Sequence, residues 1–259
     1  MLRSLLFVPA KENMLRKIGQ LDADAYIIDL EDSIENERKN EALKLVEKFI
    51  DNYNFAGEIF VRLNKHRYLQ EVIRLDKFSN IGYMLPKFEM LDSYESGAEY
   101  FRKHKVIALI ESPMGIVNVA NIVTCDWVDA LAFGAEDYVA FSNMENRNDL
   151  LRYQKSCLLT YAKAYQKPVY DTPSFHLGMC DAFKMDVQET IDFGFDGKLA
   201  ISPKHIAYIN QTFSSMSKDE ILDIIERFEE SGNAVQVIDG KVYERPHIER
   251  FKAILRSNG

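Results

Sequence analysis

Short β-rich runs alternate with longer amphipathic segments along most of this chain, and this order limits the possible folds more than any other property of the sequence. The run at 4–9 (SLLFVP) is typical of a strand, and the next segment places Met14, Leu15 and Ile18 on one helical face. The pattern recurs eight times between residues 4 and 213. The predicted strands are 4–9, 25–30, 59–63, 81–85, 106–110, 130–133, 169–171 and 198–201, and the predicted helices are 11–21, 37–50, 69–75, 93–104, 116–123, 149–165, 187–193 and 206–213.

Strands that alternate with helices indicate a parallel sheet. Eight such units within this length are typical of a TIM (β/α)8 barrel, which usually takes about 250 residues. The competing fold is an open, doubly wound sheet, which usually needs fewer strands. Its dinucleotide-binding form carries GxGxxG after the first strand, and that motif is absent from this sequence. We therefore expect an α/β barrel as the catalytic domain, residues 1–215.

The remaining residues, 216–259, predict a C-terminal helix–hairpin–helix extension. Residues 218–230 are amphipathic, and residues 235–243 resemble a hairpin with Asp239-Gly240 at its tight turn. Pro246 then precedes a final helix, 247–256. Because this tail is surplus to a complete barrel, it is free to cover the active face of the barrel or of a neighbouring subunit.

Composition excludes several classes of protein. The formal net charge is −8 and no strong Lys/Arg cluster occurs, so a nucleic-acid partner is not expected. No apolar stretch reaches about 18 residues and no signal peptide is recognisable, so no membrane association is expected. Cys125, Cys157 and Cys180 form no CxxC pair, which favours a reducing, cytoplasmic location.

Charged residues recur where the predicted strands end, and the active sites of barrels lie at that face. Clustered carboxylates repel one another unless a cation or protons compensate them, and Mg²⁺ prefers such oxygen ligands. An arginine at the same rim can hold a substrate carboxylate through two parallel hydrogen bonds. The rim residues are Asp29, Glu31, Asp32, Arg62, Asn64, Lys87, Glu111, Glu136, Asp137 and Asp171.

Structural roles compete with functional ones at these positions. Asp32 and Ser33 could cap the next helix, and Asp29 could form a structural ion pair with Arg62. Lys87 could form a Schiff base, although an ion pair with a rim carboxylate is the favoured role. No GxSxG, HExxH or P-loop motif occurs. The histidines lack ligand spacing, so we expect them at the surface or in caps: His66, His104, His176, His205 and His247.

A series of short motifs is spread over nearly the whole chain. The motifs are RSLLFVP (3–9), DLEDS (29–33), VRLN (61–64), MLPK (84–87), LIES (109–112), LAFGAEDY (131–138), GFDGKLAISP (194–203) and DGKVYERP (239–246). Each motif is weak alone, but their order and spacing are specific. Taken together, they resemble the citrate lyase β-subunit-like proteins of the HpcH/HpaI aldolase superfamily.

The resemblance implies a Mg²⁺-dependent carbon–carbon lyase on a TIM barrel, assembled as a homotrimer or homohexamer. Such enzymes cleave or form adducts of a keto-acid with an acyl-CoA, such as citryl-CoA or malyl-CoA. The implied partners are a small keto-acid of the oxaloacetate, pyruvate or glyoxylate class and an acyl-CoA. Cleavage creates an enolate, which a metal ion and a fixed positive charge would stabilise.

The motif match also implies roles for individual residues. Glu111 and Asp137 would be the Mg²⁺ ligands. Arg62 would bind the keto-acid and stabilise the developing negative charge. Glu31 and Asp32 would hold a water of the metal ion or orient Arg62.

Two further parts of the site follow from the same resemblance. Gly134, Ala135 and Glu136 would contact the substrate. Glu244, in the tail, occupies the position of an acidic residue that reaches the site of the neighbouring subunit.

Three positions depart from the family pattern. Glu244 stands where Asp is common, Ala10 and Lys11 replace a Gly-Asn pair, and Ser202 replaces a histidine. The last two changes lie near the place where the family holds coenzyme A, and the first bears on water activation.

Two alternatives therefore stay open beside the lyase. One is a malate-synthase-like transferase or an acyl-CoA thioesterase, which adds hydrolysis on the same scaffold and needs a competent acid/base at Glu244. The other is a non-catalytic subunit that binds metal and keto-acid. The presence of Arg62, Glu111 and Asp137 together argues against the non-catalytic alternative.

Overall fold

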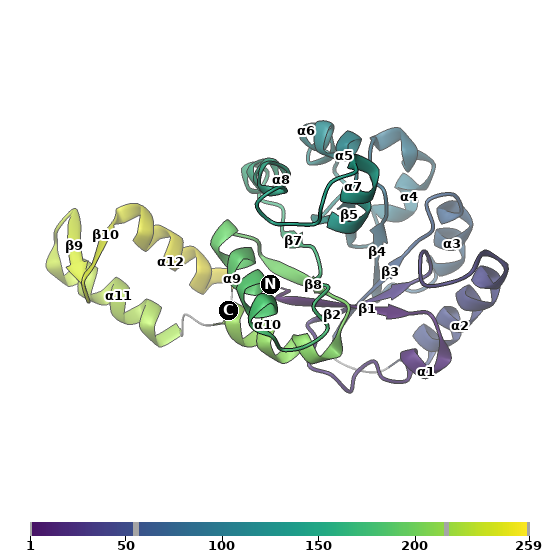
Figure 1. Ribbon diagram of the computed structural model, residues 1–259, viewed down its shortest axis with the longest axis horizontal. Helices are drawn as coiled ribbons and strands as arrows, with labels where there is room; N and C mark the ends of the chain where they lie inside the picture. The colour runs from purple at the N-terminus through teal and green to yellow at the C-terminus, as the bar shows by residue number, and fades with distance from the viewer. Residues whose placement is uncertain (1, 54–56, 215–217, 258–259) are drawn as a thin grey trace. The chain divides into compact units, whose positions relative to one another are not determined.

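Eight parallel strands close into a barrel in the computed structural model, which describes residues 2–53, 57–214 and 218–257 (Figure 1). Each strand pairs with the next along the chain, and β1 pairs with β8 to close the ring. The predicted TIM-barrel fold class is confirmed. The barrel strands are β1 (Ser4–Pro9), β2 (Ala25–Asp29), β3 (Glu58–Arg62), β4 (Ile81–Leu85), β5 (Val106–Ile110), β6 (Ala130–Phe133), β7 (Val169–Asp171) and β8 (Gly197–Ala200).

The barrel interior is filled by alternate residues of the strands, because successive side chains of a strand point to opposite faces. These residues form one buried apolar cluster: Leu5, Ala25, Ile27, Phe60, Met84, Ile107, Leu109, Ala130, Ala132, Tyr170 and Leu199. Asp29 lies two positions after Ile27 in β2, and Arg62 lies two positions after Phe60 in β3. Their side chains therefore share the inward face and reach the carboxyl-terminal rim.

Helices follow the strands around the barrel (Figure 1). The segment expected as one helix at 93–104 consists of short 3-10 turns and one helical turn, and the expected helix 116–123 is divided into two. A helix that the sequence did not predict, α7, follows β6 directly. The helices of this unit are α1 (Glu12–Leu15), η1 (Asn36–Arg38), α2 (Lys39–Asp51), α3 (Tyr68–Leu75), η2 (Leu91–Ser93), η3 (Glu95–Gly97), α4 (Ala98–Phe101), α5 (Pro113–Val117), α6 (Val119–Ile122), α7 (Ala135–Ser142), α8 (Arg152–Ala164), α9 (Asp181–Phe193), η4 (Pro203–His205) and α10 (Ile206–Phe213).

Contacts group the chain into two compact units, residues 2–210 and residues 211–259. The second unit contains α11 (Lys218–Ser231), the antiparallel pair β9 (Val235–Ile238) and β10 (Lys241–Glu244), and α12 (Arg245–Ser257). Its own apolar core is formed by Ile221, Ile225, Phe228, Ile238, Ile248 and Phe251. The predicted helix–hairpin–helix is confirmed, whereas the predicted domain limits, 1–215 and 216–259, stay a prediction.

The tight turn of the hairpin explains its sequence. Asp239 and Gly240 both have positive φ, 49° and 79°. This conformation suits a two-residue turn and is tolerated best by Gly, Asn and Asp. Within the described residues, no helix is long and apolar enough to cross a membrane.

Candidate active site

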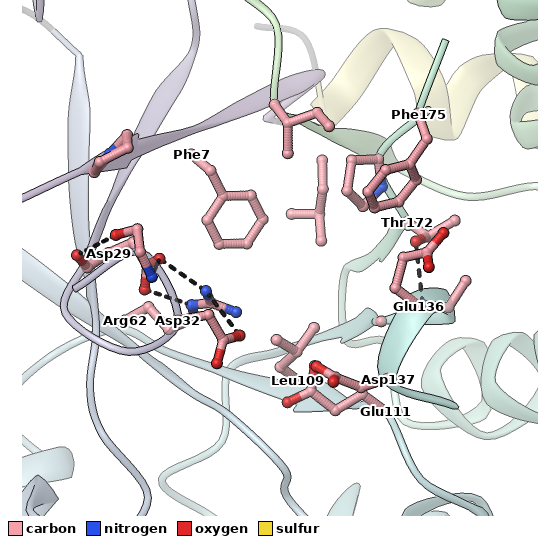
Figure 2. Close-up of a pocket in the computed structure, with 17 residues that line it drawn as sticks. Phe7, Asp29, Asp32, Arg62, Leu109, Glu111, Glu136, Asp137, Thr172 and Phe175 are labelled. Carbon is pink, nitrogen blue, oxygen red and sulfur yellow. Dashed lines mark hydrogen bonds and ion pairs between the residues drawn. The ribbon is translucent and has the colours of Figure 1, made fainter. Parts of the chain in front are cut away.

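A cavity of about 300 Å³ opens at the carboxyl-terminal ends of the barrel strands (Figure 2). One part of its wall is apolar, and the rest carries carboxylates and a single guanidinium group. The lining residues are Phe7, Pro9, Asp29, Asp32, Ser33, Arg62, Leu109, Glu111, Gly134, Ala135, Glu136, Asp137, Thr172, Pro173, Phe175, Leu199 and Ile201.

Arg62 is held at this cavity by Asp29. Its Nε and Nη2 atoms donate to the two carboxylate oxygens of Asp29, both at 2.8 Å, and both side chains are buried. Burial alone would raise the pKa of Asp29, but the hydrogen bonds and charge of Arg62 hold that pKa below its ordinary value. The guanidinium also lies 5.0 Å from the centre of the Phe7 ring. The arginine is thus fixed and charged.

Further charges surround Arg62. Its Nη1 lies 3.5 Å from Glu31, and its Nη2 lies 3.2 Å from Asp32. Lys87 reaches Glu31 at 3.1 Å from the other side. Burial lowers the pKa of Lys87, but the charges of Glu31 and Asp32 outweigh burial and raise it. A Schiff-base lysine needs a lowered pKa, so the predicted ion-pair role of Lys87 is the one that the structure favours.

Glu111 is a buried carboxylate with too little positive charge around it. Burial, followed by the negative charges of Asp137 and Glu31, raises the pKa of Glu111 well above its usual range. One oxygen, Oε1, accepts the backbone N–H of Lys87 at 2.7 Å. Lys87 holds a left-handed backbone conformation, with φ of 48°, at this contact. Such a position is consistent with strain kept for function.

Gly134 makes room for Glu111. A Cβ atom at residue 134 would lie 2.7 Å from both the Cβ and the Oε2 of Glu111. Helix α7 begins at the next residue and carries Asp137 in its first turn. Figure 2 shows Asp137 and Glu111 side by side, with Arg62 and Asp32 on the opposite side of the cavity.

The pair Glu111 and Asp137 suits a hard divalent cation. Mg²⁺ commonly takes one or two protein carboxylates and leaves its other positions to water and substrate. A larger set is not available, since the described residues contain no group of three or more His, Cys, Asp or Glu side chains placed to hold a metal. A cation held there would offset the negative charges of Asp137 and Glu31, which together with burial raise the pKa of Glu111.

The three residues expected to contact substrate, Gly134, Ala135 and Glu136, differ in whether their backbone N–H groups already have a hydrogen-bond partner. The N–H of Gly134 donates to Ile110 O at 2.9 Å, and the N–H of Ala135 donates to Thr172 Oγ1 at 3.1 Å. The second residue of α7, Glu136, has no intrahelical acceptor for its N–H. Its side chain is exposed and accepts a hydrogen bond from Asn146 at 2.6 Å.

The structure therefore brings most of the predicted site together. Arg62, Asp32, Glu111 and Asp137 line one cavity, as do Gly134, Ala135 and Glu136. Glu31 lies behind Arg62 rather than in the cavity wall. Glu244 is exposed at the end of β10 in the other compact unit, where its backbone N–H donates to His247 Nδ1 at 3.0 Å.

Asp171 was wrongly grouped with the rim carboxylates. It follows Tyr170, which points into the barrel, so its own side chain points outward. There it is fully buried and contacts Lys155 at 2.9 Å and Lys198 at 3.2 Å. Thr190 also donates to it, at 2.7 Å. Asp171 is a structural residue of the layer between barrel and helices.

The structure does not favour the alternative in which Asp32 and Ser33 cap the next helix, because η1 begins after Glu35 and has no side-chain cap. The Asp29 carboxylate instead accepts the backbone N–H of Glu31 and Ser33, at 2.8 and 3.0 Å.

The histidines also differ from expectation in two places. His104 and His205 are buried rather than at the surface. His104 Nδ1 lies 3.0 Å from Ile81 O, and the His205 ring stacks on Phe183 with centroids 3.9 Å apart.

Sequence reasoning missed Thr172 and Phe7. Residues two positions apart in a strand point to the same side, and this rule could have identified both. Phe7 lies two positions after the core residue Leu5, and Thr172 lies two positions after the core residue Tyr170.

The chain is similar to known proteins over almost its whole length. The family model described as HpcH/HpaI aldolase/citrate lyase matches residues 3–203. The citrate lyase subunit beta of Leuconostoc mesenteroides subsp. cremoris is 26% identical, over 98% of this chain and 92% of that protein. A (3S)-malyl-CoA thioesterase of Cereibacter sphaeroides is 28% identical, over 95% of this chain and 90% of its own length.

A solved structure shares the fold across the full length. It is the protein CitE from Mycobacterium tuberculosis in complex with magnesium, acetoacetate and coenzyme A, with a TM-score of 0.80 and 22% sequence identity. The similarity covers 98% of this chain and 97% of that one.

Proposed function

This chain belongs to the HpcH/HpaI aldolase/citrate lyase family, and we propose that it is a Mg²⁺-dependent lyase that acts on an adduct of a keto-acid and an acyl-CoA. Membership makes it an enzyme of a carbon–carbon lyase family. One observation carries the finer proposal: a fixed arginine, Arg62, faces the carboxylate pair Glu111 and Asp137 across a single cavity. Citryl-CoA and malyl-CoA are representative substrates.

Glu111 and Asp137 would hold the Mg²⁺ ion. When bound, the ion would act as a Lewis acid at the substrate oxygens and offset the repulsion between the two carboxylates. The complex of the Mycobacterium tuberculosis protein with magnesium, acetoacetate and coenzyme A supports a metal, a keto-acid and a CoA group as ligands of this cavity too.

Arg62 supplies a positive charge that does not need to move during the reaction. Asp29 fixes its guanidinium plane, and Glu31 and Asp32 hold the remaining edge. The Nη1 atom of Arg62 makes only the 3.5 Å contact with Glu31 within the described part of the chain, so its N–H groups can bind the carboxylate of the keto-acid portion and favour negative charge on the neighbouring oxygen. The backbone N–H of Glu136, at the start of α7, adds a donor for the same anion.

Cleavage breaks the bond between the hydroxyl-bearing carbon of the adduct and the carbon next to the thioester. The hydroxyl loses its proton and becomes the carbonyl of the keto-acid, while the bonding electrons pass to the thioester as an enolate, which is then protonated. Asp32 lines the cavity with a half-exposed carboxylate, so it is placed to receive the hydroxyl proton. Phe7 and Leu109 give this side of the cavity an apolar wall.

Hydrolysis of the thioester is a second candidate activity, favoured by the similarity to the malyl-CoA thioesterase. That reaction, like a malate-synthase-like transfer, needs a group that activates water or a carbon acid. Glu244 is our candidate for that group, acting in the site of a neighbouring subunit of a homo-oligomer. Loss of thioester hydrolysis with retained keto-acid release in Glu244→Ala would separate the two activities.

The test of the main proposal measures metal binding and cleavage together. We expect the wild-type protein to bind Mg²⁺ in calorimetry and to release a keto-acid from citryl-CoA, malyl-CoA or a related adduct only when Mg²⁺ is present. Glu111→Gln and Asp137→Asn should each weaken Mg²⁺ binding by about tenfold or more, since each removes a charged ligand, and the barrel should stay folded. Unchanged Mg²⁺ affinity in both variants would overturn the metal assignment.

A further inference from the structure

Thr172 lines the cavity from the end of β7, in a place that the proposed reaction does not yet use. Its side chain is buried, with 5% exposure, and points inward because Asp171 before it points outward. Figure 2 shows Thr172 across the cavity from Arg62. A hydroxyl group therefore faces the region where the substrate anion would lie.

The hydrogen bond to Ala135 leaves this hydroxyl with a proton to donate. Thr172 Oγ1 accepts the first backbone N–H of α7, from Ala135, at 3.1 Å. Gly134, at the N-cap position, has no side chain to take that role. A hydroxyl has one donor hydrogen besides its acceptor lone pairs. Among the described residues, none accepts a hydrogen bond from Thr172.

The hydroxyl is also held in place by the layer behind it. The preceding residue, Asp171, is fixed by Lys155 at 2.9 Å and Lys198 at 3.2 Å, and all three side chains are nearly or fully buried. Breaking such a network would leave an unpaired buried charge, so the end of β7 has little freedom to move. Thr172 thus offers a donor in a defined position.

We infer that the Thr172 hydroxyl donates a hydrogen bond to an oxygen of the bound keto-acid, with its acceptor side occupied by the Ala135 N–H. This inference rests on the proposed function, because it assumes that a keto-acid occupies the cavity. It assigns Thr172 to substrate binding, and it predicts that the substrate anion lies between Thr172 and Arg62.

The experiment titrates pyruvate and oxaloacetate into the wild type, Thr172→Val and Thr172→Ser, each at a Mg²⁺ concentration that saturates that variant. Valine matches threonine in shape but lacks the hydroxyl, so keto-acid affinity should fall by about tenfold or more, as expected for a lost hydrogen bond to a charged group. Serine keeps the hydroxyl and should bind within about threefold of the wild type.

The matched control is Ser174→Ala. Ser174 lies on the same loop, is 4% exposed and does not line the cavity, and its Oγ has no hydrogen-bond partner among the residues that the structure describes. Its loss should leave keto-acid affinity unchanged. If Thr172→Val fails to fold, as judged by circular dichroism, Thr172→Ala replaces it in the comparison with serine.

Three results would overturn the inference. The first is wild-type keto-acid affinity in Thr172→Val. The second is weakened Mg²⁺ binding with normal keto-acid binding at saturating metal, which would make Thr172 only a cap for α7. The third is wild-type protein that binds Mg²⁺ but neither keto-acid, and that result would refute the proposed function as well.

Discussion

At the scale of single residues, the cavity depends on a buried ion pair, in which each charged group compensates the cost of burying the other. Burial would lower the pKa of Arg62, yet the hydrogen bonds and charge of Asp29 raise it above its ordinary value. A buried ion pair adds little net stability, but removing one partner costs about 3–5 kcal/mol because the other charge is left unpaired. Asp29 is therefore a positioning residue, and Arg62 is the group expected to contact the substrate.

Arg62→Lys tests this division of roles. Lysine keeps the charge but loses the planar fork that matches a carboxylate, so keto-acid affinity should fall by about tenfold or more. Titration with pyruvate and oxaloacetate measures the effect. Arg74→Lys is the matched control, because Arg74 pairs with Glu47 outside the cavity. Normal keto-acid affinity combined with a lower melting temperature would assign Arg62 a structural role instead.

The raised pKa of Glu111 predicts a pH-dependent stability of the metal-free protein. Burial and the charges of Asp137 and Glu31 raise this pKa in the folded state. Folded protein thus binds the proton more tightly than unfolded chain, so stability is fully present below the unfolded pKa and falls as pH rises through the folded pKa.

Glu111→Gln removes the buried carboxylate and with it the loss of stability at neutral pH. In the presence of a chelator at neutral pH, we expect its melting temperature to exceed that of the wild type by about 2–4 °C, the shift produced by about 1 kcal/mol in a protein of this size. The difference should shrink on acidification towards the unfolded pKa. A difference that is the same at both ends of this pH range would show that Glu111 is not the group responsible.

At the scale of elements, the strands were predictable because each is a short run of buried β-forming residues. The order β1 to β8 followed from their alternation with helices. Helix α7 escaped prediction because its eight residues begin with Ala-Glu-Asp and carry no regular apolar stripe. Asp137 was expected at the end of the sixth strand, and the structure places it in the first turn of the helix that follows this strand.

The rim carboxylates show a second limit of sequence reasoning. Position at a strand end placed Glu111 correctly in the cavity but also selected Asp171, which faces away from it. The alternation of side chains along a strand distinguishes the two residues, because it shows which of them points into the barrel. It can be applied once the inward-facing core residue of each strand is known. The close approach of Gly134 to Glu111 depends on tertiary packing, which the sequence alone does not specify.

Gly134→Ala tests that close approach between the residues that directly follow β6 and β5. The new Cβ would lie 2.7 Å from Glu111 Oε2, so the carboxylate must move. We expect Mg²⁺ affinity to fall by about tenfold, because metal sites tolerate little displacement of a ligand. Gly178→Ala is the control, since a Cβ there meets no atom within 4 Å. Equal Mg²⁺ affinity in Gly134→Ala and the control would show that Glu111 can shift without cost to the metal site.

At the scale of the whole molecule, the sequence predicted that a C-terminal unit follows the barrel, and it predicted the helix–hairpin–helix fold of that unit. That unit has its own core, yet Val235, Val237 and Val242 on its hairpin are 49%, 61% and 58% exposed. Such apolar side chains are suited to contact with another surface. The second subunit of a homo-oligomer remains our predicted partner, and Glu244, at the end of the same hairpin, would then enter its active site.

Subunit mixing decides whether Glu244 acts in a neighbour. The alternative is a local role, in which its charge favours the start of α12 for about 0.3–1 kcal/mol. In thioester hydrolysis, the reaction for which Glu244 is our candidate, the Arg62→Ala and Glu244→Ala proteins should each be inactive alone. In a symmetric ring with random mixing of equal amounts, about a quarter of the sites would combine an intact rim with an intact neighbouring tail. Activity should therefore return to about a quarter of the wild-type level.

Two outcomes would contradict this role of Glu244. Confirmed subunit exchange without recovered activity would rule out action in a neighbour. Full activity of Glu244→Ala alone would remove Glu244 from the mechanism.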